Sequence, residues 1–154
     1  MKKTDSPFKI ENLEEDSGFL MLQTSRLWQE KHERVLKRHY NLSHMQYAVL
    51  ASVYWLILHS EKEVTQTILA RHTKIDPMTI SQVFKVLEKK NYIFRQRHST
   101  DVRANSVFLT EQGKELMKDA VASVIEVDTK FFQVLGKNIK NFNKELLLLL
   151  KDND

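Results

Sequence analysis

The sequence predicts a mainly α-helical fold with one small β-hairpin. The chain has 154 residues but only three Gly and two Pro, and so few turn-forming residues disfavour a β-sandwich or a many-stranded barrel. Apolar residues recur at helical spacing along most of the chain, and this period changes after residue 92. The length and a hydrophobic fraction of 42% fit one domain, 1–154, that can bury a core.

The first helical segment covers residues 13–38, which contain no Pro and one Gly. Asp16 or Ser17 is expected near its effective start. Ser43 is expected to begin the second helix, because its hydroxyl can accept from the third amide while the glutamine three residues later reaches back in a capping box. Apolar residues at helical spacing extend this helix to about residue 59.

A pair of helices follows. The shorter helix covers residues 65–72, with Thr65 as its cap. Asp76 caps the longer helix, and Pro77 occupies its first position, where no amide hydrogen bond is lost. This helix is expected to end near Lys90. Its apolar residues form one stripe that faces the core, made of Ile80, Val83, Phe84 and Leu87.

Two short strands are predicted over residues 93–97 and 106–109, and their polar, basic connection makes them a hairpin. A short helix, a turn, a longer helix and a hairpin, in that order, indicate a winged helix-turn-helix.

Residues 110–113 open another long helix, and Gly136 and Asn138 are expected to bend or break it before a final helix. The longest apolar run, Leu146–Leu150, is too short to cross a bilayer. No apolar segment follows the first lysines, as a signal peptide would require. We therefore expect a cytoplasmic protein without a membrane partner.

Positive charge is concentrated in one part of the chain. The whole sequence carries a formal charge of +4, whereas residues 71–103 hold eight basic and three acidic residues, a net of +5 that leaves −1 elsewhere. A localised basic segment is expected for a protein that binds a polyanion. On charge alone, an ordinary solvated surface explains the pattern equally well.

The sequence gives no support for catalysis or metal binding. The chain has no Cys, which excludes disulfides, thiolate metal sites, thiol catalysis and thiol redox sensing. It also lacks a Gly-rich phosphate loop, a His-Glu-x-x-His motif and a Gly-x-Ser-x-Gly motif. His32 and His39 lie two helical turns apart and cannot ligate one ion unaided. We expect no enzyme activity, no cofactor and no metal.

Four groups of segments stand in a recognisable order and spacing: Leu42–Leu50, Thr65–Ala70, Ile75–Ser81 with Leu87–Lys90, and Asp101–Arg103 with Val107–Gly113. Together they resemble the MarR family of winged helix-turn-helix transcription regulators, and the resemblance covers nearly the whole chain. Three positions depart from the family pattern: Asn91 replaces a common Gly, Val86 replaces a common basic residue, and Lys85 stands where an acidic residue is frequent.

This resemblance implies a homodimeric, sequence-specific DNA-binding regulator. Residues 43–112 would form the winged helix-turn-helix, and the helices in 10–39 and 114–151 would dimerise. The implied activity is repression at a pseudo-palindromic site in double-stranded DNA, released by a small aromatic or anionic effector. The alternative is a winged-helix dimer that binds other proteins and no DNA.

The side chains expected at the DNA combine the resemblance with residue chemistry. On the longer helix of the pair, Gln82 can pair with adenine and Lys85 with guanine. By resemblance Arg103 in the hairpin reaches the minor groove, oriented by Asp101. The start of the shorter helix can donate to a phosphate, and the arginines of the first strand contact phosphate or brace the hairpin. The full set is Thr65, Gln66, Thr79, Ser81, Gln82, Lys85, Arg95, Arg97, Asp101 and Arg103.

Family members commonly bind their effector between the dimerisation helices and the winged domain. Five aromatic side chains of this sequence fall in the relevant helices and could line such a cleft. Packing in the core and the dimer interface is the alternative role for them. They are Trp28, His39, Tyr40, Tyr47 and Trp55.

Overall fold

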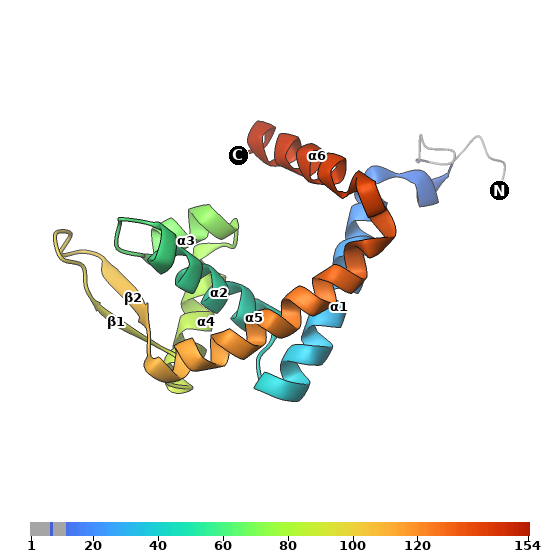
Figure 1. Ribbon diagram of the computed structural model, residues 1–154. Helices are drawn as coiled ribbons and strands as arrows, with labels where there is room; N and C mark the ends of the chain where they lie inside the picture. The colour runs from blue at the N-terminus through green and yellow to red at the C-terminus, as the bar shows by residue number, and fades with distance from the viewer. Residues whose placement is uncertain (1–6, 8–11) are drawn as a thin grey trace.

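The computed structural model describes residues 7 and 12–154 (Figure 1). The fold is mainly helical with one two-stranded antiparallel sheet, so the predicted fold class is confirmed. The elements in chain order are the 3-10 helix η2 (Leu13–Glu15), α1 (Ser17–Tyr40), α2 (His44–His59), α3 (Gln66–Thr73), α4 (Pro77–Lys89), β1 (Ile93–Arg97), β2 (Asn105–Leu109), α5 (Glu111–Phe132), the 3-10 helix η3 (Gln133–Asn138) and α6 (Ile139–Asp152).

Each of the α-helices α1 to α5 is preceded by a residue whose side chain accepts a hydrogen bond from a backbone amide of the first turn. These residues are Asp16, Ser43, Thr65, Asp76 and Thr110. Such caps satisfy amides that have no partner within the helix and typically stabilise it by about 1 kcal/mol each. The capping box predicted at Ser43 is present in both directions. The helix starts predicted from local sequence are therefore confirmed.

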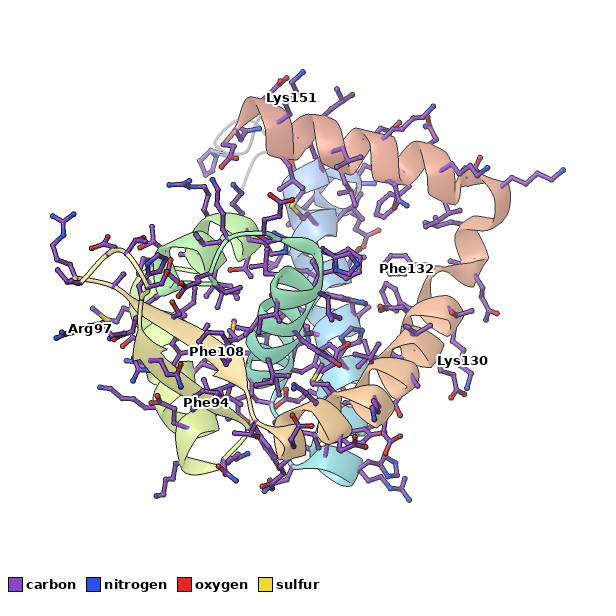
Figure 2. All side chains as sticks on the ribbon, turned by 60° about the vertical axis from the view of Figure 1, so that its left-hand side comes forward. Phe94, Arg97, Phe108, Lys130, Phe132 and Lys151 are labelled. Atoms are coloured by element: carbon purple, nitrogen blue, oxygen red, sulfur yellow. The ribbon has the colours of Figure 1, made fainter. Side chains whose placement is uncertain are left out.

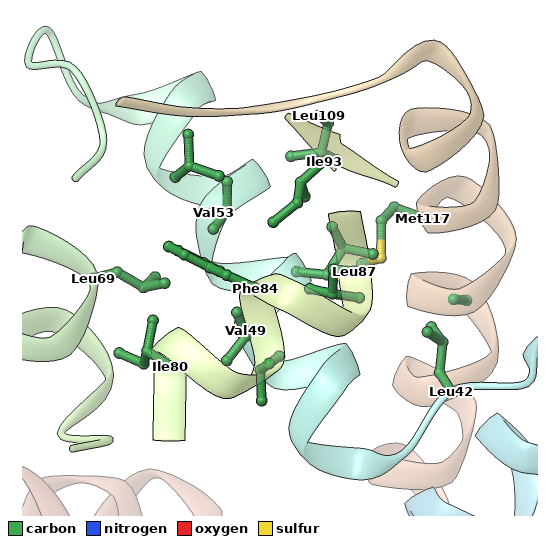
Figure 3. Packing of buried hydrophobic residues seen from close by; sticks show 14 of the residues in the cluster. Leu42, Val49, Val53, Leu69, Ile80, Phe84, Leu87, Ile93, Leu109 and Met117 are labelled. Carbon is green, nitrogen blue, oxygen red and sulfur yellow. The ribbon is translucent and has the colours of Figure 1, made fainter. Parts of the chain in front are cut away.

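We call residues 44–109, from α2 to β2, the body. Its core lies between α2, α3, α4 and the hairpin, and the first half of α5 closes it (Figure 3). Phe84 and Leu87 point into this core together with the rest of the predicted α4 stripe, which is entirely buried. Met117 of α5 is also fully buried there. The core thereby holds α3 and α4 in a fixed orientation.

The hairpin, or wing, is attached to the rest of the body along one side. The backbone amide of Val107 donates to the carbonyl of Val64 over 2.9 Å. The carboxylate of Glu63 accepts hydrogen bonds from the Ser106 hydroxyl and from the Ser99 amide. These bonds fix the wing relative to the start of α3.

We call α1, α5, η3 and α6 the arm. In Figure 1 α1 and α5 run side by side away from the body, and α6 turns back above it. The turn occurs at Gly136, whose backbone angles of φ 50° and ψ −125° are non-helical and suit glycine. The predicted break is thus confirmed. No helix in the described part of the chain is long and apolar enough to span a membrane.

Candidate nucleic-acid interface

Helix α4 has one buried face and one exposed face. Opposite the buried stripe, Met78, Gln82, Lys85 and Lys89 recur at intervals of four, three and four residues and are all exposed. Gln82 and Lys85, both predicted to contact DNA, therefore lie on the outward face. Sequence reasoning missed Met78, which is 73% exposed. The sequence signal that places Met78 on this face is its spacing of four residues, about one helical turn, from Gln82.

The two other residues predicted on α4, Thr79 and Ser81, are half-buried. Asp76 accepts from the Thr79 amide over 2.9 Å and from its hydroxyl over 2.5 Å. These bonds hold the pKa of the Asp76 carboxyl below its usual range. The Thr79 hydroxyl thus fixes the first turn of α4 and is already used as a donor.

The starts of α3 and α4 are joined by a side-chain hydrogen bond. Gln66 donates from Nε2 to the carbonyl of Pro77 over 2.8 Å, while Thr65 caps α3. Beside this contact is a hollow of about 280 Å³ whose lining includes Arg95 and Arg103. Gln66 and Thr65, predicted to contact phosphate, therefore also set the spacing of the two helices.

Arg95 braces the wing against α4. Its Nε and terminal nitrogen donate to the two carboxylate oxygens of Glu88 over 2.7 and 2.8 Å. Its guanidinium carbon lies 5.8 Å from the centre of the Phe84 ring. The bonds to Glu88 raise the pKa of Arg95. Of the two roles predicted for the strand arginines, bracing fits Arg95, whereas Arg97 is exposed at the end of β1.

The wing carries Arg103 at its tip. Asp101 Oδ1 accepts from the Arg103 amide over 3.0 Å and from its Nε over 3.4 Å, and the Arg103 side chain is 89% exposed. The contact places the guanidinium beside the turn, as the sequence predicted. An exposed ion pair of this length contributes less than about 1 kcal/mol, so Arg103 can exchange it for a phosphate or a base edge.

A second polar cluster lies where α1, α2 and α5 meet. Asp128 Oδ1 accepts from Trp28 Nε1 and from His32 Nε2, each over 2.7 Å. His32 is 2% exposed, and Nδ1 of His32 and of His44 has no partner among the described residues. Burial, and then the negative charge of Asp128, raise the pKa of Tyr47 to about 12. We call these five residues the Asp128 cluster.

The five aromatic residues predicted to line one cleft do not come together. Trp28 and Tyr47 belong to the Asp128 cluster. Tyr40 shares a hydrogen bond of 2.5 Å with Ser123 on α5. His39 is exposed, and Trp55 is 56% exposed. Residues on the same helices therefore lie on different faces, because sharing a helix does not determine which faces meet, and an effector cleft lined by these five stays a prediction.

A hollow of about 520 Å³ lies along α1, and it reaches the Asp128 cluster at His44. Its other lining residues are mostly charged: Arg26, Leu27, Gln29, Glu30, Glu33, Arg34 and Lys37. Within the described residues no group of three or more His, Asp or Glu side chains is arranged to hold a metal ion.

The arm leaves much apolar surface uncovered. Leu146 to Leu150 of α6 are each between 37% and 63% exposed. On α1, Leu20, Met21, Leu22 and Leu27 are between 44% and 57% exposed. Apolar patches of this extent on a single chain mark surfaces that bind another protein.

Comparison with known proteins places these features in context. The sequence model of the transcriptional regulator family SarA/Rot matches residues 31–120. The HTH-type transcriptional regulator YdcH of Bacillus subtilis is 37% identical over 134 residues, which cover 87% of this chain and 89% of YdcH.

Two solved structures share the fold. The MarR family regulator Sco3205 of Streptomyces coelicolor, in complex with DNA, has a TM-score of 0.79 at 20% identity, covering 96% of this chain and 91% of that chain. CouR of Rhodococcus jostii bound to p-coumaroyl-CoA has a TM-score of 0.73 at 23% identity, covering 90% and 93%.

Proposed function

Because this chain belongs to the SarA/Rot family of transcriptional regulators and has the MarR-like winged-helix fold, we propose that it is a homodimeric repressor that binds a pseudo-palindromic operator. The observation that carries the proposal is the convergence of three elements. The starts of α3 and α4 and the tip of the wing surround one hollow lined by Arg95 and Arg103. Sco3205, of the same fold, was solved with DNA.

Each element has a role that follows from its exposed chemistry. The outward face of α4 enters the major groove, where Gln82 and Lys85 contact base edges. Arg103 extends from the wing to the minor groove or its phosphates, and Arg97 contacts phosphate. The backbone amides at the start of α3 face a phosphate, which the partial positive charge of a helix N-terminus favours.

Dimerisation covers the exposed leucines of the arm. A C2 dimer presents two copies of α4, and helix-turn-helix dimers typically bind half-sites about one helical turn, or a multiple of it, apart. The body supplies the base contacts and the arm sets their spacing. Both parts are needed for specific binding.

A small aromatic or anionic effector would act at the junction of arm and body. CouR was solved with p-coumaroyl-CoA. Here the Asp128 cluster joins α1, α2 and α5, and the hollow along α1 reaches it at His44. A ligand that binds better to one arrangement of these helices shifts the spacing of the two α4 helices and releases the operator.

The test is to replace Arg103 with Ala and measure binding to DNA duplexes selected from a random library. Loss of Arg103 should weaken binding by about tenfold or more. Because one phosphate contact is lost, the slope of log affinity against log salt concentration should also become shallower by about one. Lys130→Ala is the matched control, since Lys130 carries the same charge on α5, on the side of the molecule opposite Arg97 (Figure 2).

Equal affinity of wild type and the Arg103 variant at low and moderate salt would contradict the wing assignment. A protein that enriches no duplex would favour a protein-binding role.

A further inference from the structure

Two large apolar side chains of α4 are exposed, Met78 and, to a much smaller extent, Val86 at 38%. Met78 is 73% exposed and lies on the same stripe as Gln82 and Lys85. Its side chain gains little from burial in the free protein, whereas the four apolar residues on the opposite face are all buried. Nothing in the packing of the body explains a methionine here.

The position of Met78 is well defined. It follows Pro77, the first residue of α4, and the turn that contains it is fixed by the two hydrogen bonds between Asp76 and Thr79. The Met78 backbone is therefore held while its unbranched thioether side chain adapts to the surface it meets. One turn further along the stripe is Gln82.

The major groove offers one apolar group on a base edge, the C5-methyl group of thymine. The polar residues of the stripe match donors and acceptors, and Met78 matches this methyl group. We propose that Met78 determines specificity by contacting a thymine methyl group in each half-site. This inference rests on the proposed function, because it requires that the outward face of α4 enters the major groove.

The test compares thymine with uracil, which differs only by the missing methyl group. Duplexes are selected from a random library with wild-type protein, and the enriched duplex is then synthesised with deoxyuridine at each thymine in turn. Burial of one methyl-sized group corresponds to about 0.8 kcal/mol, so uracil at the contacted position should weaken binding about fourfold. Replacement in both half-sites should weaken it about fifteenfold if the contacts are independent.

The variants assign the contact to Met78. Met78→Ala should bind the thymine duplex about as weakly as wild type binds the uracil duplex, and it should no longer distinguish the two. Met78→Leu, which keeps an apolar side chain, should retain most of the preference. Val102→Ala is the matched control: Val102 is also 73% exposed but lies on the wing, and the minor groove displays no thymine methyl group. That variant should distinguish thymine from uracil as wild type does.

The outcomes separate this inference from the proposed function. Enrichment of a duplex whose binding is unaffected by uracil at every position, or a Met78→Ala variant that keeps the full preference, would overturn the role of Met78 alone. Failure of the protein to enrich any duplex would overturn the proposed function and the role of Met78 with it.

Discussion

The body and the arm bury their apolar side chains in different ways. Most of the core lies in the body, where Phe84, Leu69 and Val107 are 0–1% exposed. Helix α6 of the arm has no buried residue, although Leu146–Leu150 are consecutive leucines. The body is thus packed within one chain, whereas the arm leaves apolar side chains uncovered, which we propose a second copy covers. Mutations should affect folding in the body and assembly in the arm.

The largest effect is expected from a cavity in the body. Phe84→Ala removes a fully buried ring and should lower the free energy of unfolding by about 3–5 kcal/mol, measured by urea denaturation. Phe94→Ala is the control, because Phe94 is 40% exposed and pairs with Phe108 on the surface of the hairpin. It should cost less than about 1 kcal/mol. Equal losses for both variants would contradict the assignment of the core to this face of α4.

In the arm, the corresponding change should break assembly and leave the body folded. Leu146→Glu with Leu149→Glu places two carboxylates on the apolar side of α6, where a partner chain would have to desolvate them. Sedimentation equilibrium should then show a monomer, with the helical circular dichroism signal of the body retained. Lys151→Glu changes the charge of the same helix at an exposed position and should remain a dimer. If the double variant still forms a stable dimer, the dimer interface does not include this side of α6.

A smaller effect is expected within the arm, where α1 meets α5. Asp128→Ala leaves the Trp28 and His32 donors without their acceptor, and His32 is buried. An unsatisfied buried donor costs about 1–3 kcal/mol, so the urea midpoint should fall accordingly. Asp128→Asn keeps one acceptor oxygen, so it should lower the free energy of unfolding by less than the Ala variant does. Identical stability of wild type and the Ala variant would show that this cluster does not hold α1 to α5.

The smallest expected effect is the response of the wing to acid. Hydrogen bonds from Ser106 and Ser99 lower the pKa of Glu63. A lowered carboxyl pKa stabilises the folded state above the ordinary glutamate pKa, and this contribution is lost as pH falls through the folded value. The amide chemical shift of Ser99, followed by NMR, should therefore titrate with a midpoint below the ordinary glutamate pKa. In Glu63→Gln this transition should vanish, and its persistence would assign it to another group.

The sequence predicted local features well. The caps at Asp76 and Ser43 depend on residues within one turn, and the break at Gly136 depends on one backbone conformation, so each is readable without knowing the fold. The buried stripe of α4 was predicted for the same reason, because helical periodicity alone defines it.

Features that depend on contacts between distant residues were not predictable. Asp128 meets Trp28 and His32 across about a hundred residues of sequence, so the Asp128 cluster is not visible in the sequence. Met78 is apolar, so a selection of DNA contacts by polarity omits it. Its exposure on the outward face of α4 becomes apparent only in the structure.

The most direct test of the account is to map where α4 lies on the DNA. The chain has no Cys, so Lys89→Cys provides a single attachment point for a DNA-cleaving iron chelate at the end of the outward face of α4. On the selected duplex, a two-fold symmetric dimer with both α4 helices in the major groove should give two clusters of cuts related by that symmetry, with their centres separated by about 10 base pairs or a multiple of this. One cluster without a symmetric partner, or uniform cleavage along the duplex, would contradict it.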